Sequence, residues 1–213
     1  DTLLACPPGK IGEIWTAGPS VAQGYWRKPQ LTAETFHAYL ADDPQEENPT
    51  GSHAHRGPYL RTGDLGFVYE GELYVTGRLK DLIIIRGRNY YPQDIEHSVE
   101  SCHEALEIGM SAAFSITDNG EEKLILVREV TRRHRHPDIE SVAAAVRRAV
   151  AQQHQLQLHA IVLIRPLSMP RTSSGKIQRH ICKQNYLDGT LRIIAEWQAT
   201  KAPPAAQHTP LVT

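Results

Sequence analysis

The first part of the chain alternates short apolar stretches with polar ones, a pattern typical of strands. Residues 12–17 read as one strand, and residues 67–76 read as two strands joined by a tight turn, which predicts a hairpin. Between them, residues 32–36 favour a short helix with Thr32 as its N-cap. Residues 37–58 are polar and rich in Asp, Glu, Pro and Gly, so they predict a loop or an insertion. This part of the chain is therefore expected to be β-rich.

Further along, strand-like and helix-like patterns alternate. Strands are predicted at residues 82–85, 111–116, 123–130 and 160–164, and helices at 92–102, 138–153 and 177–186. Pro92 favours the first turn of its helix, and Asp118-Asn119-Gly120 predicts a hairpin turn. Helical spacing is clearest in a set of apolar residues, Ile139, Val142, Ala143, Val146 and Val150. The change of character at residues 78–81 predicts a domain boundary.

These patterns predict an α+β protein with a β-rich unit over residues 1–79 and a small α/β domain over residues 80–196. The tail, residues 197–213, has the Ala- and Pro-rich composition of a linker. The chain opens at Asp1 with neither an initiator methionine nor a signal sequence, and it soon enters a strand. We therefore expect it to be a piece of a longer polypeptide.

Composition narrows the class of partner. The 23 basic and 24 acidic residues nearly balance, so nothing global indicates nucleic acid or an anionic membrane, and no apolar run is long enough to span a bilayer. The cysteines are odd in number and far apart: Cys6, Cys102 and Cys182. They fit no disulfide framework and no metal site, which favours the reducing cytoplasm. The histidine pairs at residues 53–55 and 134–136 lie in polar stretches, so we expect solvated loops there and no metal.

A lysine-bearing polar turn, Thr172-Ser173-Ser174-Gly175-Lys176, is the first candidate for chemistry. Backbone N–H groups and an ammonium both favour anions. A P-loop would need glycine at Pro170 and a hydroxyl residue at Ile177, so that reading fails. What remains is a lysine on a loop, able to stabilise charge on a phosphoryl or carboxylate group. The alternative is an ordinary exposed lysine.

Two further segments carry candidate ligand-binding groups. In residues 59–66, the carboxylate of Asp64 follows a Thr-Gly turn and can accept hydrogen bonds from a vicinal diol such as ribose. In residues 77–87, Arg78 offers a fork of donors to ribose or phosphate oxygens. The alternatives are an Asp-capped turn and a strand flanked by solvated charges.

The order of these motifs is more specific than any one of them. Thr-Gly-Asp, then Gly-Arg-x-Lys-Asp, then Pro-x-Thr-x-Ser-Gly-Lys resembles the C-terminal half of the acyl-adenylate-forming superfamily, over residues 9–195. That superfamily contains acyl-CoA synthetases, luciferases, peptide-synthetase adenylation domains and fatty acyl-AMP ligases. Residues 86–96 resemble the fatty acyl-AMP ligase version, and residues 37–58 fall where that family has an insertion or beside it. The resemblance implies that residues 1–79 are a β-rich remnant of a large N-terminal domain.

The resemblance implies a role for each matching residue. Asp64 would bind the ribose hydroxyls, Arg78 would contact ribose or phosphate oxygens, and Val75 would pack near the adenosine. Lys176 would be the catalytic lysine, bridging the acyl carboxylate and the α-phosphate of ATP while the adenylate forms.

Other matching positions concern movement and the second substrate. Lys80 matches the hinge about which the small domain swings, and the backbone at Gly87 would line the acceptor channel. Asn89 stands where several CoA ligases carry a longer or basic side chain, which disfavours CoA as the acceptor.

The implied activity is the activation of a fatty acid by ATP and Mg²⁺ and its transfer to an acyl carrier protein. Most Mg²⁺ ligands would lie outside this chain, which alone is expected to bind ATP poorly and to be inactive. A basic group could steer an acidic carrier or be a solvated face: Arg132, Arg133, Arg135, Arg147 and Arg148. The alternatives are an acyl-CoA synthetase and a truncated, non-catalytic carrier-docking module.

Overall fold

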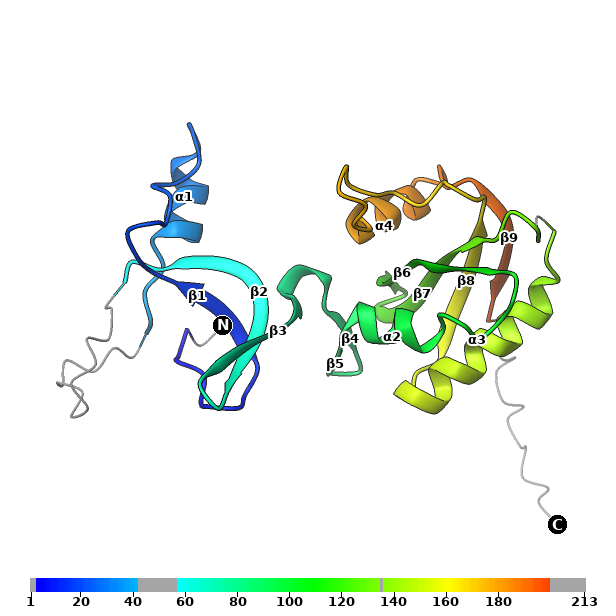
Figure 1. Cartoon of the computed structure of the whole chain (residues 1–213), viewed down its shortest axis with the longest axis horizontal. Coiled ribbons are helices and arrows are strands. Elements are labelled where there is room, and N and C mark those ends of the chain that lie inside the picture. Colours follow the sequence, from blue (N-terminus) through cyan, green and yellow to red (C-terminus); the bar gives the residue numbers. More distant parts are fainter. Residues whose placement is uncertain (1–2, 42–56, 135, 200–213) are drawn as a thin grey trace, which may run out of the picture. The chain divides into compact units, whose positions relative to one another are not determined.

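The computed structural model describes residues 3–41, 57–134 and 136–199. The chain divides into two compact units, unit 1 (Asp1–Leu82) and unit 2 (Ile83–Thr213), which are drawn in Figure 1 and treated separately below. The predicted insertion and the predicted tail lie largely outside the described residues.

Unit 1 holds an antiparallel three-stranded sheet in the order β1-β2-β3 among its described residues. The strands are β1 (Gly12–Thr16), β2 (Leu60–Tyr69) and β3 (Glu72–Arg78), and a 3₁₀ turn, η1 (Leu79–Asp81), follows them. The predicted strand and hairpin are confirmed, although β2 begins earlier than expected. Leu65 is the one buried hydrophobic residue in the described part of this unit.

The helix of unit 1, α1 (Pro29–Phe36), corrects one prediction. Thr32 is not its N-cap, because the helix begins at Pro29, whose fixed φ suits the first turn. The Thr32 hydroxyl instead accepts a hydrogen bond from the Tyr25 N–H at 2.9 Å and so holds the incoming loop.

Unit 2 begins with a small hairpin of β4 (Ile83–Ile85) and β5 (Arg88–Tyr90). Positive φ at Arg86 and Gly87 closes it as a two-residue turn. The strand β5 was not predicted, and the predicted strand 82–85 is only half buried, because Ile84 is exposed. The helix α2 (Pro92–Ser98) starts at Pro92 as predicted but ends sooner, where the Ser98 hydroxyl donates to the Ile95 carbonyl.

The main sheet of unit 2 has the order β6-β7-β8-β9. Its strands are β6 (Leu106–Asp118), β7 (Glu121–Val130), β8 (Leu158–Ile164) and β9 (Ile193–Gln198). The predicted turn joins β6 to β7, and the helix α3 (Ile139–His154), capped by the Asp138 side chain, carries the chain to the parallel strand β8. The strand β9, antiparallel to β8, was missed by the sequence analysis.

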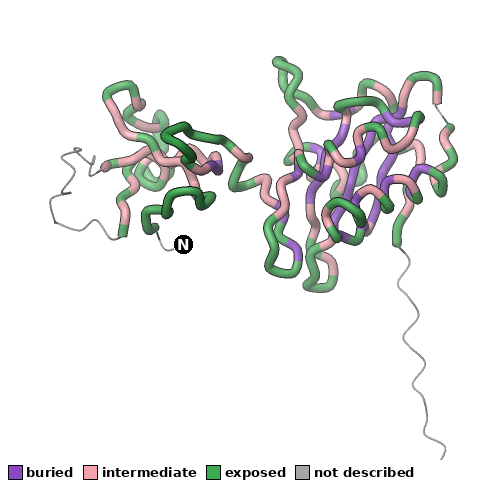
Figure 2. Tube along the Cα trace, turned by 60° about the horizontal axis from the view of Figure 1, so that its bottom comes forward, coloured by how far each residue is buried: buried purple, intermediate pink, exposed green. Residues whose placement is uncertain are grey.

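The buried residues of unit 2 gather along the strands of this sheet (Figure 2) and form two hydrophobic clusters. Alternate residues of β7 face opposite sides: Leu124 and Leu126 pack with α2 and α3, whereas Ile125 and Val127 pack beside Cys182 of α4 (Arg179–Leu187). The predicted fold class, a small α/β domain preceded by a β-rich unit, is confirmed. Among the described helices, none is long and apolar enough to cross a membrane.

Candidate functional site

Asp64 lies in an irregular part of β2. Opposite Ile14 of β1, the strand carries Thr62, Gly63 and Asp64, so the segment bulges out of register. The Thr62 hydroxyl donates to the Ile14 carbonyl at 2.7 Å and accepts from the Asp64 N–H at 3.1 Å, while Gly63 adopts a φ of +72°. The predicted turn is therefore a bulge within a strand, and side-chain bonds hold it in shape.

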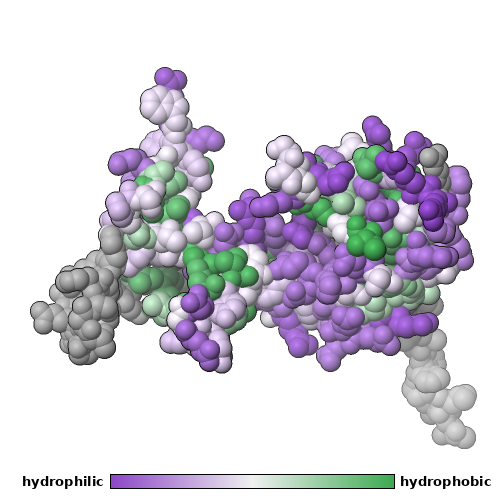
Figure 3. Space-filling model, viewed as in Figure 1, coloured by the Kyte–Doolittle hydropathy of each residue, from purple (hydrophilic) through white to green (hydrophobic). Residues whose placement is uncertain are grey.

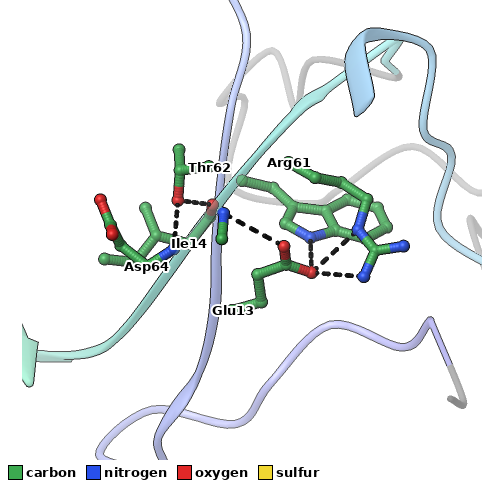
Figure 4. A network of polar contacts seen from close by, with 7 residues as sticks. Glu13, Ile14, Arg61, Thr62 and Asp64 are labelled. Atoms are coloured by element: carbon green, nitrogen blue, oxygen red, sulfur yellow. Dashed lines mark hydrogen bonds and ion pairs between the residues drawn. The ribbon is translucent and has the colours of Figure 1, made fainter. Parts of the chain in front are cut away.

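The carboxylate of Glu13 fixes the other side of this bulge (Figure 4). It accepts hydrogen bonds from the Trp15 indole at 2.9 Å, from Arg61 Nε at 2.9 Å and from the Gly63 N–H at 3.2 Å. The Glu13 side chain is 14% exposed and that of Arg61 30% exposed, so the pair is partly shielded from water. Sequence reasoning missed Glu13, and an acidic residue inside a predicted strand was the available signal.

Asp64 and Arg78 are brought together by the pairing of β2 with β3. Arg78 Nε donates to Asp64 Oδ1 at 3.0 Å, and the two side chains are 37% and 55% exposed. The Asp64 carboxylate points away from Glu13 in Figure 4. Val75 of β3 is exposed, as are the neighbouring Leu73 and Tyr74, and Figure 3 shows hydrophobic surface on this unit. The β2–β3 hairpin therefore presents a solvent-exposed carboxylate, a solvent-exposed guanidinium and apolar surface. Together these groups can bind a polar ligand that has a flat apolar part.

Lys176 lies in a closed turn. The ends of the turn meet in a β-bridge between Arg171 and Ile177, and the Thr172 N–H donates to the Lys176 carbonyl at 2.8 Å. The Lys176 N–H donates to the Thr172 hydroxyl at 3.0 Å, and Gly175 turns the chain with a φ of +84°. Backbone atoms of Lys176 thus hold the turn, while its ammonium stays exposed and available to an anion.

A shielded ion pair anchors the chain just after this turn. Glu96 of α2 accepts from Arg179 Nε at 2.7 Å and from its terminal nitrogen at 2.6 Å, and also from the Ala113 N–H of β6 at 2.9 Å. The side chains of Glu96 and Arg179 are 11% and 22% exposed. The Glu96 carboxylate therefore links α2, β6 and the start of α4. This long-range link was not predicted from the sequence.

The remaining predicted residues lie at turns and edges. Lys80 is exposed in η1, two residues before unit 1 ends at Leu82. Gly87 has a φ of +73°, and a Cβ added there would meet no atom within 4 Å. Asn89 is exposed on β5.

In the described part of the chain, no three His, Cys, Asp or Glu side chains are arranged to hold a metal ion. The pair His53 and His55 lies outside that part. His134 is half-buried rather than fully solvated, with Nδ1 2.9 Å from the Thr131 hydroxyl.

The cysteines are free thiols, exposed at Cys6, half-buried at Cys102 and buried at Cys182. Burial raises the pKa of the Cys182 thiol to about 12.

The predicted basic group is spread over two elements. Arg132 and Arg133 are exposed just after β7, whereas Arg147 and Arg148 are exposed on α3. The Arg147 guanidinium lies 4.6 Å from the centre of the Trp197 ring, so part of its charge is engaged there. Arg135 lies outside the described residues.

Comparison with known proteins gives the family. The model of the AMP domain of Disco-interacting protein 2-like proteins matches residues 80–196. The chain belongs to this AMP-domain family. It is 48% identical to a medium-chain-fatty-acid–[acyl-carrier-protein] ligase, JamA of Moorena producens, over 93% of this chain and 31% of that protein. It is 40% identical to a long-chain-fatty-acid–AMP ligase, FadD26 of Mycobacterium tuberculosis, over 91% of this chain and 32% of the relative.

A solved structure supports the same assignment for this AMP domain. Work on fatty acyl-adenylate ligases from E. coli and L. pneumophila gives a chain that is 34% identical, with a TM-score of 0.60. The match covers 86% of this chain and 29% of that one. The resemblance to the fatty acyl-AMP ligases is thereby confirmed. The chain spans about a third of the length of the curated relatives it matches.

Proposed function

We propose that this chain is part of a fatty acyl-AMP ligase that loads an acyl carrier protein. A carboxylate oxygen of the fatty acid attacks the α-phosphorus of ATP and displaces pyrophosphate, which gives the acyl-adenylate. The phosphopantetheine thiol of the carrier then attacks the acyl carbon and displaces AMP. The observation that carries this proposal is the identity, over nine-tenths of this chain, to relatives named as a fatty-acid–AMP ligase and a fatty-acid–[acyl-carrier-protein] ligase.

The hairpin of β2 and β3 would bind the nucleoside part of ATP. Asp64 would accept hydrogen bonds from the ribose hydroxyls, because an ionised carboxylate is an acceptor with several lone pairs. Arg78, which touches it, would donate to ribose or phosphate oxygens, and Val75 would offer apolar surface to the adenosine. Glu13 would act as a positioning residue by holding the bulge.

Lys176 would act on the reacting groups. Two anions must approach each other during adenylation, so an ammonium that contacts both the carboxylate and the α-phosphate lowers the barrier. Its exposed side chain on a turn held by backbone atoms suits that role. Mg²⁺ would supply further charge compensation when bound. Most of its ligands would lie outside this chain, in the rest of the complete enzyme.

We further propose that Lys80 is the hinge and that the backbone at Gly87 lines the acceptor channel. The position of Lys80 close to the end of unit 1 and the open space at Gly87 support these roles. The domain division would be residues 1–79 and 80–196, and the linker predicted for residues 197–213 would begin only after β9, which extends to Gln198. The reducing cytoplasm, which supplies ATP and keeps the three cysteines as thiols, is the proposed compartment.

The acceptor is tested by supplying the complete enzyme with ATP, a fatty acid and either free CoA or a carrier protein bearing phosphopantetheine. We expect acyl-carrier protein to accumulate and acyl-CoA to stay near background, measured by mass spectrometry. Efficient release of acyl-CoA would overturn the choice of acceptor. The 213-residue chain alone is expected to form no adenylate, and tight ATP binding by that chain in calorimetry would contradict this expectation.

A further inference from the structure

A second polar site lies in unit 2, in a pocket of about 170 Å³ between α2 and the strands β6 and β7. Its lining residues are Gln93, Glu96, His97, Glu100, Gly109, Ser111 and Arg128. His97 has an 84% exposed side chain, so the pocket is reached from solvent. None of these residues is among those assigned above to the ligase reaction.

A bulge in β6 forms one wall of the pocket. Leu106 pairs with Val130 and Ser111 with Arg128, so β6 carries extra residues between these two pairs. Gly109 lies in the bulge with a φ of +70°. The irregular strand therefore leaves open space where a regular strand would have packed.

The floor of the pocket carries donors without partners. Arg128 is 0% exposed, and only its Nη2 is bonded, donating to the carbonyls of Glu100 at 3.2 Å and Glu107 at 3.1 Å. Arg128 Nε, Arg128 Nη1 and the Ser111 hydroxyl are buried without a hydrogen-bond partner. Burial lowers the pKa of the Arg128 guanidinium, since its charge is poorly solvated. Buried donors of this kind are normally satisfied, so the pocket favours a ligand that offers acceptor oxygens to Arg128 and Ser111.

The pocket also contains an acceptor. A Cβ at Gly109 would lie 3.9 Å from Glu100 Oε1, which places that carboxylate at the pocket wall. Glu100 Oε2 lies 3.4 Å from His97 Nδ1, while Glu96 is occupied by Arg179. A ligand must therefore accept hydrogen bonds from Arg128 and Ser111 and present a proton to Glu100.

We propose that this pocket binds a phosphate group that retains a proton, as inorganic phosphate or a phosphate monoester. Such a group has several acceptor oxygens for Arg128 and Ser111 and one O–H that can donate to Glu100. Near pH 6 to 7 a phosphate monoester still carries that proton in part, because its second pKa is about 6. Sulfate is fully ionised at that pH, so it would bring its charge against the Glu100 carboxylate without a hydrogen bond between them. The site does not depend on the proposed ligase reaction.

The test is calorimetric titration of the 213-residue chain at about pH 6.5 with inorganic phosphate, glycerol 3-phosphate and sulfate. We expect saturable binding of phosphate, with sulfate at least about tenfold weaker, since one charged hydrogen bond is worth roughly that factor. Glycerol 3-phosphate tests whether the pocket accepts a phosphate monoester. If it does, glycerol 3-phosphate should bind as tightly as inorganic phosphate; if the pocket holds only the free ion, glycerol 3-phosphate should bind more weakly. Absence of phosphate binding, or equal binding of sulfate, would overturn the proposal.

Variants connect the binding to the pocket. Ser111→Ala should weaken phosphate binding about tenfold, whereas Ser115→Ala, on the same strand but outside the pocket, should leave it unchanged. Glu100→Gln should narrow the difference between phosphate and sulfate, because an amide does not repel sulfate. Arg128→Met should abolish binding, and circular dichroism would check its folding. If Ser111→Ala and Glu100→Gln both behave as wild type, the bound phosphate lies elsewhere and the proposal fails.

Discussion

Replacing Glu96 by alanine will destabilise unit 2 strongly. The substitution removes a carboxylate that accepts two hydrogen bonds from Arg179, at 2.7 and 2.6 Å, and a third from the Ala113 N–H at 2.9 Å. Both charged side chains are largely shielded, with 11% and 22% exposure, so water can replace only part of what is lost. The change leaves the Arg179 charge without its two-point partner and the Ala113 donor unsatisfied.

The expected loss follows from these contacts. Removing one partner of a buried ion pair typically costs about 3–5 kcal/mol, and an unsatisfied buried N–H costs about 1–3 kcal/mol. The two effects overlap on one carboxylate, so we expect a loss of roughly 3–5 kcal/mol in the free energy of unfolding for Glu96→Ala. Glu96→Gln keeps an acceptor oxygen without the charge and should lose about 1–3 kcal/mol. Removing Arg179 as well should cost less than the sum of the two single changes.

Urea unfolding followed by far-UV circular dichroism measures these differences. Glu121→Gln is the matched control, because its partner Lys123 and the 73% exposed Glu121 form a surface pair. Such pairs contribute roughly 0–1 kcal/mol. If Glu96→Ala unfolds within about 1 kcal/mol of wild type, like that control, then the ion pair does not anchor the three elements as argued.

Two further predictions concern a buried thiol and a positioning carboxylate. Burial raises the pKa of the Cys182 thiol from 9.0 to about 12. At about pH 8 this thiol should therefore resist alkylation by iodoacetamide, whereas the exposed Cys6 should be alkylated. Equal alkylation rates of the two cysteines, measured by mass spectrometry, would contradict this prediction. Between about pH 9 and pH 12 the unfolded Cys182 thiol ionises and the folded one does not, so this thiol should lower the free energy of unfolding by up to about 1.4 kcal/mol per pH unit. Cys182→Ala should remove this contribution, while the contributions of Cys102 and Tyr186, whose pKa values burial also raises, should remain. In the complete enzyme, Glu13→Gln should raise the KM for ATP about tenfold with a smaller change in kcat, because the bulge that presents Asp64 loses charged hydrogen bonds. The matched control is Glu34→Gln, which makes the same substitution at an exposed residue of α1. Equal KM values for the two variants would refute the positioning role of Glu13.

Elements with local signals were predictable from the sequence. Pro92 set the start of α2, and Asp118-Asn119-Gly120 set the turn between β6 and β7. The apolar period of α3 matched the buried face of that helix. In each case the residues that decide the structure lie within a few positions of one another.

Elements formed by distant pairing were not predictable. The residues of β9, Ile193–Gln198, lack a clean alternation and become a strand because they pair with the buried strand β8. Likewise, β5 consists of Arg88, Asn89 and Tyr90, and it owes its form to pairing with β4 across a two-residue turn. Their strand form comes from the partner strand, which a local reading does not show.

The candidate site shows the same difference between local sequence signals and long-range contacts. Asp64, Arg78 and Lys176 stand in short motifs whose order carried the resemblance. The contacts that position them join residues far apart: Glu13 and Arg61 are 48 residues apart, and Glu96 and Arg179 are 83 apart. Only the fold brings those charges within hydrogen-bond distance, so the sequence alone indicated the candidate residues but not the side chains that position them.

The role of Lys176 is tested most directly by pyrophosphate release from the complete enzyme with ATP and a fatty acid. Lys176→Ala should lower that rate by ~10²–10³, as for removal of a single charge-stabilising donor. Folding should be retained, because backbone atoms of Lys176 hold the turn. Lys183→Ala, a change of another lysine on α4, should release pyrophosphate like wild type. A folded Lys176→Ala enzyme with the wild-type rate would contradict the assignment of Lys176 as the catalytic lysine.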